Sequence, residues 1–106
     1  MGYNIEIEGE YMQVYLVKGV DDYDAHVYSV HLTYKGALLE GCQQIIGTLF
    51  EYQWDQETDD EIESVRLSLN KERITQKELQ SRFDTLVDIG ESCGIFISVE
   101  TKTLQP

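Results

Sequence analysis

The spacing of hydrophobic residues in this chain changes at Gly36. Before it they recur at every second position, and after it at every third or fourth position. Before Gly36, apolar and polar side chains alternate over 3–8, 11–17 and 25–35, which is typical of half-buried strands. After Gly36, a helical stripe extends to about residues 52–54 and comprises Leu38, Cys42, Ile45, Ile46 and Leu49. Because strands and helices bury stripes of different period, the chain is restricted to folds that combine both.

The first two alternating segments are predicted to form a β-hairpin. Gly9–Glu10 separates them, and glycine at the first central position fits a two-residue type II′ turn. In that register Ile7 faces Met12, and every apolar residue of one strand meets an apolar residue of the other. The predicted core-facing residues of the second strand are Met12, Val14 and Leu16.

A polar loop is predicted over 18–24, and the third strand follows it. Alternation assigns one set of its side chains to the core and the other set to solvent. The predicted core set is Tyr28, Val30, Leu32 and Tyr34, and the predicted solvent set is Val27, Ser29, His31 and Thr33. The three strands would form an antiparallel meander with one solvated face.

The second half of the chain contains a helix with a clear start and end. Thr75 is followed three residues later by Glu78, which predicts a capping box, and Gly94 marks the end of the helix. Its apolar stripe is Leu79, Phe83, Leu86, Val87 and Gly90. Segments of period two at 64–70 and 95–103 are predicted strands. An exposed loop is predicted over 55–63, which holds six carboxylates and no base.

The predicted fold is therefore a single α+β domain that spans residues 1–106. The expected order is β-β-β-α-β-α-β, with a mainly antiparallel sheet and two helices packed on one face of it. The order of the strands within the sheet does not follow from the sequence pattern.

The net negative charge of the chain comes entirely from its first 63 residues. They hold 14 Asp and Glu against two lysines, so their net charge of −12 (2 − 14) equals that of the whole chain. A one-sided negative field selects basic partners. Direct binding of nucleic acid is disfavoured, because phosphates would be repelled and the chain has no basic patch.

The acidic half also contains all seven tyrosines and the one tryptophan. Tyrosine and tryptophan provide rigid contact area at interfaces, and a carboxylate array can occupy a site built for phosphates. We therefore expect this half to bind a basic surface lined by Lys and Arg. The residues expected to make the contact are Glu6, Glu8, Tyr11, Tyr15, Asp21, Asp22, Asp24, Asp55, Asp59, Asp60 and Glu61.

Residue patterns for metal binding are incomplete. Asp55, Glu57 and Asp59 have the spacing that opens an EF-hand loop. The sixth position of that loop is Asp60 instead of glycine, and the twelfth is Arg66 instead of glutamate. His26 and His31 point to opposite faces of their predicted strand, so they cannot share an ion. We expect neither a metal nor a cofactor.

Catalytic patterns are also incomplete. The chain has neither a G-x-S-x-G motif nor a phosphate-binding glycine loop. Cys42 and Cys93 fall on apolar stripes, so we expect free, buried and unreactive thiols rather than a disulfide. These features predict a protein that is not an enzyme.

Together, the patterns predict an acidic inhibitor that mimics nucleic acid and occludes a nuclease or another basic nucleic-acid-binding protein. In size, charge and lack of cofactor the chain is similar to phage anti-CRISPR proteins and to the immunity proteins of nuclease toxins. The alternative is a small structural or regulatory subunit, a homodimer or complex component whose acidity serves solubility only. A ligand-binding or enzyme domain without a recognisable motif is a third class. Because no signal peptide or membrane-spanning apolar run is present, a cytoplasmic protein is expected.

Overall fold

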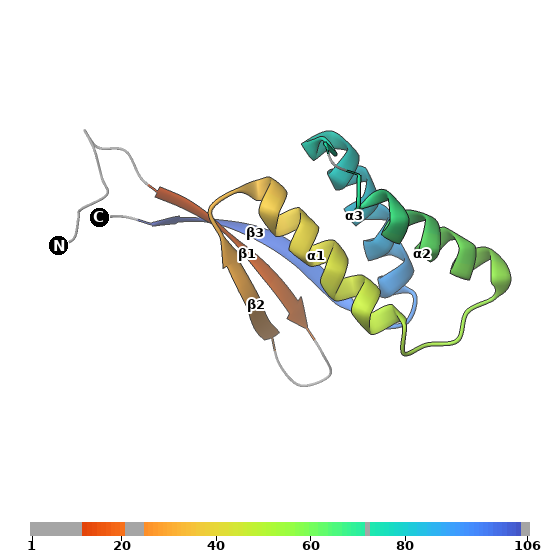
Figure 1. Ribbon diagram of the computed structural model, residues 1–106. Helices are drawn as coiled ribbons and strands as arrows, with labels where there is room; N and C mark the ends of the chain where they lie inside the picture. The colour runs from red at the N-terminus through yellow and green to blue at the C-terminus, as the bar shows by residue number, and fades with distance from the viewer. Residues whose placement is uncertain (1–11, 21–24, 72, 105–106) are drawn as a thin grey trace.

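The computed structural model describes residues 12–20, 25–71 and 73–104. These residues form one α+β domain with a three-stranded antiparallel sheet and three helices (Figure 1). The strands are β1 (Met12–Val20), β2 (Ala25–His31) and β3 (Phe96–Leu104), and the helices are α1 (Tyr34–Leu49), α2 (Gln56–Ser68) and α3 (Gln76–Glu91). The predicted fold class is confirmed, but the described order β-β-α-α-α-β differs from the predicted one.

The sheet has the order β2-β1-β3, and both neighbours of β1 are antiparallel to it. From Tyr15 to Val20, β1 pairs with β2 on one edge and with β3 on the other. The predicted strand at 3–8 and its turn at Gly9–Glu10 lie outside the described residues. The predicted loop at 18–24 is wrong in its first part, because β1 continues through Val20.

The face of β1 that packs against the helices is the opposite of the predicted one, although Val14 is buried as predicted. Val17 is fully buried, and Tyr15 packs against the same core cluster. Val14 is buried outside that cluster, and Leu16 is half-buried. Tyr15, Val17 and Gly19 occupy alternate positions in β1, so they share the face that packs against the helices.

The prediction for β2 is wrong at Ser29 and Val30, whereas Val27 is exposed as predicted. Ser29 pairs with Val17 and is half-buried, whereas Val30 is 58% exposed and Leu32 is 71% exposed. The register shifts beside Val17, so that Tyr28 is an additional residue in β2. A β-bulge of this kind changes which side chains face the core, and sequence alternation does not reveal it.

Helices α1 and α3 cover one face of the sheet, as predicted for two helices (Figure 1). The Thr33 hydroxyl caps α1 by accepting a hydrogen bond from the Gly36 N–H at 3.0 Å. All five residues of the predicted α1 stripe are buried. The capping box at Thr75 and Glu78 is present at the start of α3, and Gly94 has a positive φ of 86° after its end.

Helix α2 replaces both the predicted loop at 55–63 and the predicted strand at 64–70. The Asp55 carboxylate begins the helix by accepting a hydrogen bond from the Thr58 N–H at 2.8 Å. Ile62 and Val65, three residues apart, are buried in the core cluster, while Leu67 is exposed. The apparent alternation of Val65 and Leu67 therefore reflects two different faces of a helix.

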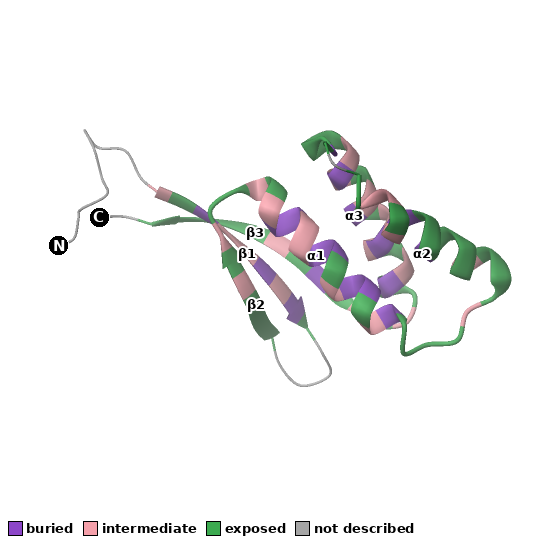
Figure 2. Cartoon of the chain, viewed as in Figure 1, coloured by how far each residue is buried: buried purple, intermediate pink, exposed green. Residues whose placement is uncertain are grey.

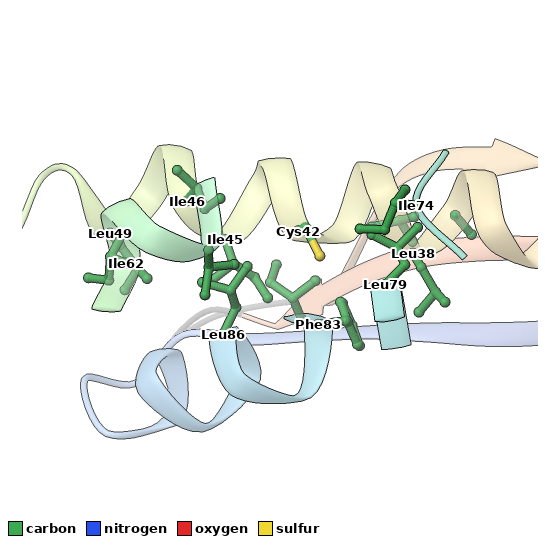
Figure 3. Packing of buried hydrophobic residues seen from close by; sticks show 14 residues of the cluster. Leu38, Cys42, Ile45, Ile46, Leu49, Ile62, Ile74, Leu79, Phe83 and Leu86 are labelled. Atoms are coloured by element: carbon green, nitrogen blue, oxygen red, sulfur yellow. The ribbon is translucent and has the colours of Figure 1, made fainter. Parts of the chain in front are cut away.

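The core lies between α1, α3 and the sheet, and Ile62 and Val65 of α2 belong to the same cluster. Figure 2 shows buried residues along α1 and an exposed surface along most of α2. Figure 3 shows Ile62 of α2 near Leu49 at the end of α1. The apolar side of α2 therefore packs against the core near the C-terminal end of α1, while its other side is exposed.

Replacement by alanine should change the free energy of unfolding in opposite directions at two glycines of α1. A Cβ at Gly41 would lie 2.6 Å from Cε1 of the buried Phe83 ring, whereas a Cβ at Gly47 meets nothing within 4 Å. Gly47→Ala should raise the free energy of unfolding by about 0.5–1 kcal/mol, because alanine restricts the unfolded backbone. Gly41→Ala must also displace Phe83, and overpacking costs about 1–3 kcal/mol, so we expect a net loss. Urea unfolding measures both values, and equal stabilisation would contradict the close approach of α1 and α3.

The capping box of α3 should give the protein a defined sensitivity to acid. A hydrogen bond from Lys71 and further ones with Thr75 lower the pKa of Glu78 from 4.5 to about 2. Because the pKa is lower in the folded state, ionised Glu78 stabilises the fold above pH 4.5, and this contribution disappears as the pH falls towards 2. Glu78→Gln retains a capping partner without a titrating group. Its free energy of unfolding should therefore fall less steeply over this pH range than that of the wild type, and parallel curves would refute the assignment.

Candidate acidic and aromatic binding surface

The N-terminal half of α2 and its capping residue carry six exposed carboxylates. They are Asp55, Glu57, Asp59, Asp60, Glu61 and Glu63. The apolar side of the helix, with Ile62 and Val65, faces the core. The carboxylates therefore occupy the remaining circumference of the helix, and we call this set the α2 acidic array.

The spacing of the array resembles that of a nucleic acid. From Asp55 to Glu63 the helix axis rises about 12 Å at about 1.5 Å per residue. Six carboxylates over that length give roughly one charge per 2 Å, against about one per 1.7 Å in duplex DNA. Before the pairing of Glu63 with Arg66 is counted, the array thus has a linear charge density along the helix axis comparable to that of a duplex.

Local contacts fix the charge and orientation of part of the array. The hydrogen bonds to Thr58 hold the pKa of Asp55 below its usual value, so this carboxylate is ionised at neutral pH. Arg66 forms an ion pair with Glu63, and its hydrogen bonds lower the pKa of that carboxyl group. Asp60 accepts a hydrogen bond from Gln56 Nε2 at 2.8 Å. Within the described part of the chain, no base forms an ion pair with Asp59 or Asp60.

A groove of about 330 Å³ separates α2 from the end of α1. Its apolar lining includes Leu49 and Ile62, and aromatic residues of the connection between the helices, Phe50, Tyr52 and Trp54, form one side. The rings of Tyr52 and Trp54 lie with centroids 6.0 Å apart, and the Trp54 indole N–H donates to the Leu49 carbonyl oxygen at 3.1 Å. We call this feature the α1–α2 groove.

Three carboxylates of the α2 acidic array also line the α1–α2 groove. They are Asp59, Asp60 and Glu63. The groove therefore combines aromatic faces with negative charge, which suits the long side chain and cationic end of Arg or Lys.

Five of the predicted contact residues lie in the described part of the chain, and four of them come together. Asp55, Asp59, Asp60 and Glu61 belong to the α2 acidic array. Tyr15 is separate, because its ring packs edge-on against Tyr34 with centroids 5.6 Å apart. The other predicted contacts lie outside the described residues: Glu6, Glu8, Tyr11, Asp21, Asp22 and Asp24.

The aromatic residues of the groove are not among the contact residues predicted from the sequence. Phe50 and Tyr52 are exposed, and Trp54 is half-buried. The available signal was the placement of three aromatic residues at alternate positions directly before the acidic run. Recognising it required the knowledge that residues 55–63 turn back beside α1 as a helix.

The two thiols differ in their surroundings. Cys42 is fully buried in α1, and burial, followed by the nearby Asp84 charge, raises its pKa to about 12. Its thiol is therefore protonated at neutral pH and unsuited to nucleophilic attack. Cys93 is half-buried beyond the C-cap of α3 rather than on a helix face, and its thiol donates to the Gly90 carbonyl oxygen at 3.3 Å. Both thiols are free.

Two further observations apply to the described ranges only. They contain no group of three or more His, Cys, Asp or Glu residues arranged to hold a metal ion. None of their helices combines the length and the apolar character needed to cross a bilayer.

Comparison with family models, with curated proteins and with solved structures gives no match for this chain.

Proposed function

We propose that this protein is a non-enzymatic inhibitor that binds the basic nucleic-acid-binding surface of a partner protein and occludes it. The observation that carries the proposal is the α2 acidic array, with six exposed carboxylates at nearly the charge density of duplex DNA. A partner whose Lys and Arg side chains are spaced for phosphates meets carboxylates at similar intervals. Complementary charge of this kind accelerates association and makes it sensitive to salt.

The α1–α2 groove supports the same proposal. An interface needs buried aromatic or apolar anchors in addition to charge, because exposed ion pairs alone contribute little affinity. Phe50 and Tyr52 are exposed beside the array and offer such anchors. The protein would therefore contact its partner through one continuous surface formed by α2 and the residues that precede it.

A second candidate function is a subunit that associates through the sheet. On the face opposite Val17, Val27 and Val30 are exposed in β2, and Leu104 is exposed in β3. No described helix covers this face. Association there would bury apolar area and would be insensitive to salt, which separates it experimentally from the first function.

The experiment that tests the proposed function is capture of proteins from a nuclease-treated host lysate on the immobilised full-length chain. We expect basic nucleic-acid-binding proteins to be retained, and to be released by moderate salt or by added duplex DNA. Release by duplex DNA is the decisive step, because it requires that the two ligands compete for one surface. Retention of proteins that duplex DNA and high salt leave in place would contradict the inhibitor and favour the subunit.

A further inference from the structure

We infer that the α1–α2 groove is a binding site for an arginine side chain supplied by the partner protein. This inference rests on the proposed function, because it assigns the partner group that enters the site. The groove is lined by two kinds of residue that bind a guanidinium favourably: the aromatic residues Tyr52 and Trp54, and the carboxylates Asp59 and Asp60.

The aromatic side of the groove is already in place before a ligand enters. The Trp54 indole is fixed by its hydrogen bond to the Leu49 carbonyl oxygen, at the point where α1 ends. The neighbouring Tyr52 ring is inclined to it at 40°. Because the Trp54 indole need not be ordered on binding, a planar cation that stacks on it loses little of its interaction energy to entropy.

One of the three carboxylates that line the groove accepts no hydrogen bond from the described residues. Glu63 is engaged by Arg66, and one oxygen of Asp60 accepts from Gln56. The Asp59 carboxylate has no such partner among residues 12–20, 25–71 and 73–104. Asp59 is therefore the residue that we assign to the incoming guanidinium, with Asp60 providing additional negative charge.

Arginine fits this arrangement better than lysine does. Its planar guanidinium stacks on aromatic rings and donates two parallel hydrogen bonds to a carboxylate, and it is more weakly hydrated than an ammonium group. The groove would thus serve as an anchor that distinguishes Arg from Lys within a basic surface. The rest of the α2 acidic array would contribute general attraction without that distinction.

Trp54 is the only tryptophan of the chain, so its fluorescence reports directly on the α1–α2 groove. The probes are three capped peptides that differ at two positions, with arginine, lysine or leucine there and glycine elsewhere. We expect the arginine peptide to change Trp54 emission saturably, with an affinity about fivefold or more above that of the lysine peptide. We expect the leucine peptide to give no saturable change.

Asp59→Asn supplies the matched variant, because it removes one charge from an exposed position and leaves the indole unchanged. It should abolish the preference for arginine, while Asp84→Asn on α3, with the same change in charge, should retain it. Equal responses to arginine and lysine, a response to leucine, or an unchanged Asp59→Asn variant would each overturn the inference. If a basic protein is captured and is released by duplex DNA, but the arginine peptide does not change Trp54 emission, the arginine site is refuted and the proposed function is not. If the arginine peptide changes Trp54 emission, but no basic protein is captured and released by duplex DNA, the proposed function is refuted and the arginine site is not.

Discussion

Replacing both Asp59 and Asp60 by lysine should weaken binding of the basic partner by about 100-fold or more. The change converts two attractive charges into two repulsive ones, and like charges placed opposite each other at an interface cost several kcal/mol. Since 1.4 kcal/mol corresponds to a factor of ten, a loss of this size follows from the pair alone. The measurement is the dissociation constant of a captured partner, determined for the wild type and for the variant at the same ionic strength.

The control for this prediction is Asp84→Lys with Asp88→Lys. Both residues are exposed on α3, so the change in net charge is the same but lies outside the α2 acidic array. Lysine near the start of α2 opposes the helix dipole, so far-UV circular dichroism should confirm that each variant remains folded. Asp59→Asn with Asp60→Asn provides a milder second variant. Equal losses of affinity in the α2 and α3 variants would show that net charge alone matters, and would contradict the proposed surface.

Truncation of Leu38 to alanine should cause the largest loss of stability among the substitutions considered. Leu38 is fully buried in α1 and belongs to the core cluster that joins this helix to the sheet and α3 (Figure 3). Buried leucine-to-alanine changes cost about 2–5 kcal/mol, through lost burial and the cavity that remains. A small domain has only about 5–15 kcal/mol of stability in total, so urea unfolding should reveal the loss clearly.

Leu67→Ala is the matched control for that substitution. Leu67 is 56% exposed on α2, and exposed substitutions usually change stability by less than about 0.5 kcal/mol. If residues 64–70 formed a core strand, Leu67 would be buried and its truncation would be costly. A loss at Leu67 comparable to that at Leu38 would therefore contradict the helical assignment of α2.

The parts of the fold that the sequence predicted correctly are those with independent local signals. The α1 stripe repeats over five buried residues, and α3 combines a stripe with the Thr75 capping box and Gly94. Helix α2 offered conflicting signals, because a run of acids is typical of a loop and Val65 with Leu67 suggested a strand. The Asp55 cap and the spacing of Ile62 and Val65 indicate the helix, but only packing against Leu49 selects it.

Several residues of the sheet were assigned to the wrong face for a different physical reason. Alternation shows which residues share a face, but not which of two faces a helix will cover. In β2 the bulge at Tyr28 also interrupts the alternation, and Tyr28 itself lies over Gly19, whose Cβ would be 2.5 Å from the tyrosine Cε2. This close approach is a tertiary contact, so no local pattern predicts it.

The candidate site was predictable in its chemistry but not in its shape. The acids at Asp55, Asp59, Asp60 and Glu61 were identified from charge alone, and they share one helix in the structure. The aromatic side of the α1–α2 groove depends on how α2 packs against the end of α1. Tyr15 was included because of its type, although its half-buried ring packs edge-on against Tyr34.

Whether the α2 acidic array contacts the partner is tested by the salt dependence of partner binding, compared between the wild type and Asp59→Asn with Asp60→Asn. The dissociation constant of a captured partner would be measured over a series of sodium chloride concentrations. Because the Debye length shrinks from about 30 Å at 0.01 M to about 3 Å at 1 M, binding through the α2 acidic array should weaken steeply as salt rises. The slope of log Kd against log salt should be smaller for the variant, since fewer carboxylates contact the partner. An affinity that is independent of salt, or a slope that the two substitutions leave unchanged, would contradict the account.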